Sequence, residues 1–80
     1  MVIVDGVAVE RYRGEAIARM GRNITWGELA RKVEMTETGL RLIRTGKSPG
    51  SLETCSKLVD AFSDYGLTLS HSDLLRAKWK

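Results

Sequence analysis

The sequence predicts an all-α fold, a five-helix bundle with a helix-turn-helix at its centre, formed by residues 1–80 as a single domain. Apolar residues recur at helical spacing through most of the chain, and two threonines are placed to cap short helices on either side of a tight turn. No repeat, low-complexity segment or interdomain linker interrupts this pattern. Eighty residues lie near the lower limit of what folds without disulfides or metals.

The central helix-turn-helix covers residues 25–46. Thr25, followed three residues later by Glu28, forms a capping box, which is the signature of a helix start. Thr36 can cap a second helix, and Gly46 can end it in a left-handed conformation. Only two residues separate the helices, so they cross at a steep angle, the geometry that lays a second helix in the major groove of DNA. The apolar residues expected on the inner faces are Leu29, Ala30 and Val33 in the first helix and Leu40 and Ile43 in the second.

The N-terminal segment admits two interpretations. A helix over about residues 7–20, capped by Asp5, would turn apolar residues at helical spacing toward the core. Alternatively, Asp5-Gly6 between the valine-rich residues 2–4 and 7–9 matches a β-hairpin with a two-residue turn. We prefer the helix because the apolar spacing continues beyond the point where a hairpin would stop, and because an isolated hairpin is only marginally stable.

Two further helices complete the predicted bundle. Ser51 opens a fourth helix to about residue 62, after a turn-rich loop at residues 47–50, and Asp64-Tyr65-Gly66 ends it. A last helix is expected over about residues 72–78. The apolar face of the fourth helix contains Cys55, Leu58, Val59 and Phe62, so we interpret the cysteine as a small core residue and not as a reactive thiol.

Composition argues against several classes of protein. One cysteine cannot form an intramolecular disulfide or supply the thiolates of a zinc site, so neither a metal nor any other cofactor is expected. The longest apolar run is too short to span a bilayer and no signal peptide is recognised, so we expect a cytoplasmic protein with no membrane partner. His71, the only histidine, lies in a short polar segment as a capping or solvent-facing residue. With no catalytic set in view, neither an enzyme nor a small-molecule binder is expected.

Positive charge is concentrated in the helix-turn-helix. The net charge is +3, but the segment from Arg19 to Lys47 contains seven basic residues and three acidic ones. The residues on either side of that segment carry no excess of positive charge. Since charge and motif coincide, a surface facing phosphates is favoured over a merely solvated pair of helices.

The residues from about Arg19 to Phe62 resemble the Cro/C1-type (XRE-type) helix-turn-helix regulators of phages and bacteria. The similarity lies in Ile24-Thr25, Glu28-Leu29-Ala30, Met35-Thr36, Leu40, Ile43, Gly46-Lys47 and Ser51-Leu52-Glu53-Thr54. The resemblance implies a lambda-repressor-like DNA-binding domain that acts as a transcriptional repressor. It also implies a homodimer on a pseudo-palindromic double-stranded DNA operator, with half-sites roughly 34 Å apart.

In such a complex the second helix, over about residues 36–45, would present its N-terminal part to base edges. Glu37 could accept a hydrogen bond from a cytosine amino group, Thr38 could offer its methyl group to thymine, and Arg41 could pair with guanine. The candidate base-reading residues are Thr36, Glu37, Thr38, Arg41 and Leu42, and the candidate phosphate contacts are Trp26, Arg22, Arg31, Arg44 and Lys47. For Thr36 a capping role, and for Arg41 a phosphate contact, remain open.

Three positions depart from the family pattern. Trp26 stands where a glutamine commonly opens the first helix of the pair and orients the second. Glu34 stands where the turn often has a left-handed glycine, which would cost about 1–2 kcal/mol if that conformation is kept. Arg44 stands where an acid often pairs with an arginine at the position of Arg19, so that bridge cannot form and Arg44 is left free to face the DNA.

A second class of function is a protein-interaction module, an antirepressor or antitoxin whose partner is another protein. Glu37 at the head of the second helix and the missing glutamine favour this alternative, whereas the basic excess opposes it. Dimerisation is expected because one recognition helix reads few base pairs. The candidate interface consists of Leu69, Leu74, Leu75 and Trp79.

Overall fold

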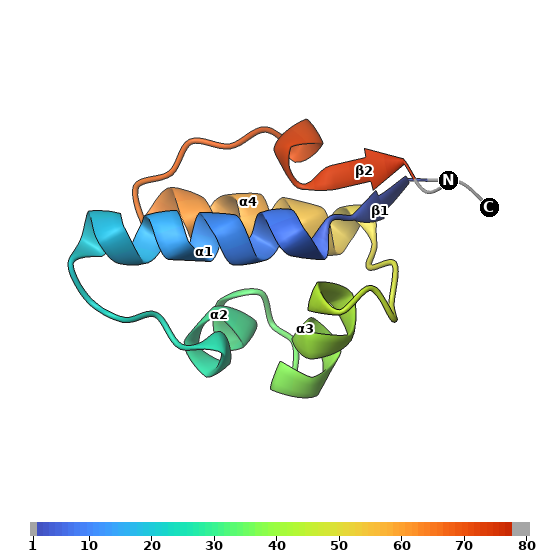
Figure 1. Ribbon diagram of the computed structural model, residues 1–80, viewed down its shortest axis with the longest axis horizontal. Coiled ribbons are helices and arrows are strands. Elements are labelled where there is room, and N and C mark those ends of the chain that lie inside the picture. The colour runs from blue at the N-terminus through green and yellow to red at the C-terminus, as the bar shows by residue number, and fades with distance from the viewer. Residues whose placement is uncertain (1, 78–80) are drawn as a thin grey trace.

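Figure 1 shows the computed structural model of the protein, which describes residues 2–77. Two long helices lie side by side in the middle, two short helices lie on one side of them, and a small sheet with the last loop lies on the other (Figure 1). The elements are β1 (Val2–Val4), α1 (Gly6–Met20), α2 (Trp26–Lys32), α3 (Glu37–Arg44), α4 (Leu52–Asp64), a 3-10 turn at His71–Asp73, and β2 (Leu75–Ala77).

The predicted five-helix bundle is therefore wrong in its last element. Four α-helices are present among residues 2–77, and the segment expected to be a fifth helix forms the 3-10 turn and β2. Strand β2 pairs antiparallel with β1, with Val2 opposite Ala77 and Val4 opposite Leu75. The β-branched residues of β1 favour a strand, and its unpaired backbone groups can form hydrogen bonds with residues 75–77. Lys78, the end of the predicted helix, lies outside the described residues.

The N-terminal helix is confirmed and the hairpin interpretation is wrong, although residues 2–4 do form a strand. Asp5 Oδ1 accepts hydrogen bonds from the backbone N–H groups of Val7 and Ala8, so Asp5 caps α1 instead of starting a turn. Gly6 is buried where α1 begins, and a Cβ there would lie 2.6 Å from the backbone oxygen of Ile43. The absent side chain therefore lets α1 approach the end of α3.

The helix-turn-helix has the predicted caps. Thr25 Oγ1 accepts a hydrogen bond from the N–H of Glu28 at 3.1 Å, and Thr36 Oγ1 accepts one from the N–H of Gly39 at 3.0 Å. Glu34 in the turn has a φ of 57°, so it adopts the left-handed conformation whose cost was considered above. All five apolar residues predicted for the inner faces are buried. These local features fix the angle at which α3 leaves α2.

Helix α4 begins at the predicted cap and closes the core. Ser51 Oγ accepts a hydrogen bond from the N–H of Thr54, and the helix continues to Asp64, beyond the predicted end. Cys55 is fully buried, as predicted, and burial raises the pKa of its thiol. Tyr65, which the sequence placed in a helix-ending turn, is a core residue exposed to only 2%. No helix in residues 2–77 is long and apolar enough to cross a membrane.

Candidate nucleic-acid interface

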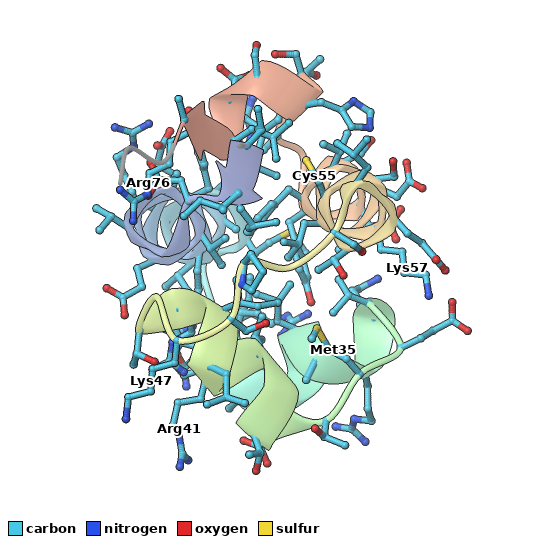
Figure 2. All side chains as sticks on the ribbon, turned by 90° about the vertical axis from the view of Figure 1, so that its right-hand side faces the viewer. Met35, Arg41, Lys47, Cys55, Lys57 and Arg76 are labelled. Atoms are coloured by element: carbon cyan, nitrogen blue, oxygen red, sulfur yellow. The ribbon has the colours of Figure 1, made fainter. Side chains whose placement is uncertain are left out.

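Helix α3 has one buried and one exposed side. Leu40 and Ile43 face inward and hold the helix against the body of the protein. The five predicted base-reading residues are all exposed: Thr36, Glu37, Thr38, Arg41 and Leu42. In Figure 2, Arg41 projects away from the body at the same end of the molecule as Lys47. The helix therefore presents a surface that is free of the chain's own side chains within the described residues.

Two of these side chains are already engaged within the protein. The Thr36 hydroxyl is the N-cap of α3, so its oxygen serves the backbone of its own helix. The Glu37 carboxylate lies over Gly27 in α2, where a Cβ would meet Glu37 Cδ at 3.2 Å. Thr38, Arg41 and Leu42 make no side-chain hydrogen bond to described residues, and 40% of Leu42 is exposed.

Four of the five predicted phosphate contacts are cations and fall into two groups, and the fifth, Trp26, is described below. Arg31 and Lys47 are exposed and form no ion pair with any residue in the described range. Arg22 and Arg44 are instead held by acids: Arg22 donates two hydrogen bonds to Glu28, and Arg44 Nε lies 3.7 Å from Glu10 Oε1. The available cationic surface on this side is therefore smaller than the basic count of the segment indicates.

The Arg22–Glu28 pair is part of a network that reaches the core. Arg22 Nη1 and Nη2 lie 2.9 and 3.0 Å from the two Glu28 oxygens, and the Tyr65 hydroxyl donates to Glu28 Oε2 at 2.6 Å. The hydrogen bonds from Arg22, and then that from Tyr65, lower the pKa of Glu28 to about 2. Burial, and then the hydrogen bond to Glu28, raise the pKa of Tyr65 to about 12. Through this network the chain entering α2 is anchored to the end of α4.

Two guanidinium groups lie over the ring of Trp26. Arg44 Cζ lies 3.8 Å from the centroid of the indole ring, and Arg13 Cζ lies 4.5 Å from it. The Arg44 side chain is only 18% exposed, and its Nε is buried without a hydrogen bond. The expectation that Arg44 is free to face the DNA is therefore wrong. Arg44 instead pairs with Glu10 of α1. The base is therefore on α3 and the acid on α1, the reverse of the family pattern.

The contacts of Arg13 and Arg19 were not foreseen from the sequence. Arg13 Nε donates to the backbone oxygen of Ile24 at 2.6 Å, which ties α1 to the loop that leads into α2. Arg19 Nε donates to the backbone oxygen of Gly66 at 2.7 Å, far from Arg44. Arg13 and Trp26 are distant in the sequence, and nothing in their spacing indicates that the guanidinium group lies over the indole ring.

The predicted dimer residues are largely part of the fold. Leu74 is completely buried in the core, so it cannot line an interface, which corrects that prediction. Leu69 and Leu75 are partly buried against the same core, and Trp79 lies outside the described residues. The 3-10 turn and the β1–β2 pairing hold Leu74 and Leu75 against the core.

The chemistry of the remaining polar residues is limited. His71 is exposed, and its Nε2 lies 2.8 Å from Ser56 Oγ. Within residues 2–77, no three His, Cys, Asp or Glu side chains are grouped so that they could hold a metal ion. Comparisons of the chain with protein-family models, curated proteins and solved structures find no match.

Proposed function

We propose that this protein is a sequence-specific transcriptional regulator, a Cro/C1-like repressor that inserts α3 into the major groove of double-stranded DNA. One observation carries the proposal: α3 buries Leu40 and Ile43 and leaves its other side, with Thr38, Arg41 and Leu42, uncovered by the described chain. A recognition helix needs this division, because side chains used to hold it cannot also reach base edges.

The charge around α3 supports the same function. Arg31, Arg41 and Lys47 are exposed cations without an ion pair in the described range, and Arg41 and Lys47 project from the same end of the molecule (Figure 2). Cations on this side would neutralise phosphates on both sides of the groove. Each phosphate contact steepens the dependence of log affinity on log salt by about 0.9.

Operator recognition in this proposal requires a homodimer. Helix α3 is a little over two turns long and reaches only a few base pairs, too few to specify one site in a genome. Two copies with half-sites roughly 34 Å apart would double the sequence that is read. Because Leu74 is in the core, the dimer contact must use other residues.

Selection of bound sequences from a random DNA library tests the proposal. We expect a pseudo-palindromic consensus, and binding that weakens steeply between about 50 and 200 mM salt. R41A and K47A should each reduce affinity. R76A removes the same charge from strand β2, across the long helices from α3 (Figure 1), where Arg76 Nε lies 3.9 Å from Asp5 Oδ1, and it should leave affinity nearly unchanged. Equal losses in all three variants would show that the effect is net charge and not this surface.

The second candidate is a protein-interaction module. It is favoured by the pairing of Arg22 and Arg44 with acids and by the exposed apolar side chain of Leu42 beside Glu37 on α3. For this function we expect no binding to mixed-sequence DNA at about 50 mM salt. A tight complex with a protein partner that is lost in a Leu42→Asp variant would establish it.

A further inference from the structure

The Glu37 carboxylate rests over a glycine of the neighbouring helix. A Cβ built on Gly27 would lie 3.2 Å from Glu37 Cδ and 3.4 Å from each of its two oxygens. Both oxygens are equally near, so the carboxylate group is laid across the first turn of α2. A methyl group at Gly27 would therefore take space that the acid now occupies.

Nothing else in the described residues fixes that carboxylate. Glu37, the first residue of α3, makes no side-chain hydrogen bond or ion pair with residues 2–77. A long exposed side chain of this kind has several rotamers of similar energy. The absence of a side chain at Gly27 thus determines which Glu37 rotamers can place the carboxylate against α2.

The presence of glycine at this position has no other explanation in the helix itself. Gly27 is the second residue of α2, has no left-handed φ, and glycine is disfavoured in helices relative to alanine. Gly14 in α1 is also helical, but a Cβ there would meet nothing within 4 Å. Of these two glycines, only Gly27 has a functional candidate directly above it.

We propose that Gly27 is a positioning residue: by admitting the Glu37 carboxylate across α2, it determines where that acid meets the DNA and hence the base pair Glu37 prefers. This inference rests on the proposed function. The group recognised would be a hydrogen-bond donor in the major groove, for which the exocyclic amino group of cytosine is the match. Hydrogen-bond strength falls steeply with distance and angle, so a displacement of a few tenths of an ångström changes the preference.

The test measures base preference in a double-mutant cycle. Affinities of the wild type, G27A, E37A and G27A/E37A are measured for the selected operator and for operators changed at one base pair at a time. We expect G27A to lower discrimination by about tenfold at the single base pair that also loses discrimination in E37A. In the E37A background, where the acid is absent, G27A should change nothing further.

Two measurements separate positioning from folding. G14A is the matched control, because it also replaces a helical glycine by alanine, and it should leave every base preference unchanged. Thermal melting of G27A should occur at or above the wild-type temperature, since alanine favours the helix. In the free wild-type protein, nuclear Overhauser effects should connect the Gly27 Hα and Glu37 Hγ protons, independently of any DNA.

The inference is overturned if G27A keeps the wild-type preference while E37A loses it, or if G27A has the same effect with and without Glu37. A uniform loss of affinity for all operators would assign Gly27 a structural role only and would also overturn it. Failure of every variant, including the wild type, to bind DNA is a different result, because it rejects the proposed function itself.

Discussion

Replacing Glu34 by glycine should stabilise the protein, because Glu34 holds the turn of the helix-turn-helix in a conformation that suits glycine. Its φ of 57° costs a residue with a Cβ about 1–2 kcal/mol. Glycine offsets about 0.5–1 kcal/mol of this gain, because it has more conformational freedom in the unfolded state and loses more entropy on folding. The net gain expected for E34G is thus about 0.5–1 kcal/mol, or about 2–8 °C in melting temperature for a domain of this size.

The ion pair of Glu34 does not reverse this expectation. Glu34 Oε1 lies 3.5 Å from Lys57 Nζ, but the Glu34 side chain is 76% exposed and Lys57 keeps a second partner, Glu53, at 3.4 Å. E34Q is the control, since it removes the charge and keeps the strained backbone, and it should melt slightly below the wild type. Thermal unfolding followed by circular dichroism measures both variants. An E34G protein that melts at or below E34Q would refute the strain argument.

Three further changes test other parts of the fold. Leu74 is fully buried between the sheet and the helices, so L74A should cost about 2–5 kcal/mol and lower the melting temperature by at least about 8 °C; a smaller loss would mean that the C-terminal segment is not part of the core. Because the pKa of Glu28 is lowered to about 2, its stabilisation is complete above its ordinary pKa of 4.5 and is lost as the pH falls toward 2. Melting temperatures across that range should fall more steeply for the wild type than for E28Q, and parallel curves would contradict the assignment. G6A should destabilise the protein despite its better helix propensity, since the added methyl would collide with the backbone at the end of α3, whereas G14A should raise the melting temperature; scanning calorimetry of the two variants side by side gives the comparison, and equal shifts would argue against the close approach of α1 and α3.

The features that could be predicted are those set by neighbours in sequence. Thr25, Thr36 and Ser51 cap helices because a side-chain oxygen reaches an N–H three residues later, an interaction that spacing alone reveals. The left-handed φ of Glu34 was considered only through the resemblance, since its own side chain gives no local signal for that conformation. The exposed side of α3 was equally accessible to prediction, since the buried positions of a short amphipathic helix define the exposed ones.

What could not be predicted depends on partners distant in the chain. A helix was expected over about residues 72–78, and pairing with β1, which local spacing does not reveal, makes residues 75–77 a strand. The stacking of Trp26 with Arg44 joins two helices at contact distances that sequence does not specify. The hydrogen bond from Tyr65 to Glu28 likewise links residues that are far apart in the chain. Glu28 also pairs with a predicted phosphate contact, Arg22, whose side chain remains 49% exposed.

The β1–β2 ladder joins the first and last elements of the described residues. Val2 lies opposite Ala77, so this pairing joins segments that are distant in the chain. Loop closure over so long a segment costs entropy that the helices between the strands must first reduce, so this ladder is expected to form late in folding. The sheet lies across the long helices from α2 and α3, so late pairing of its strands would not delay the assembly of the helix-turn-helix (Figure 1).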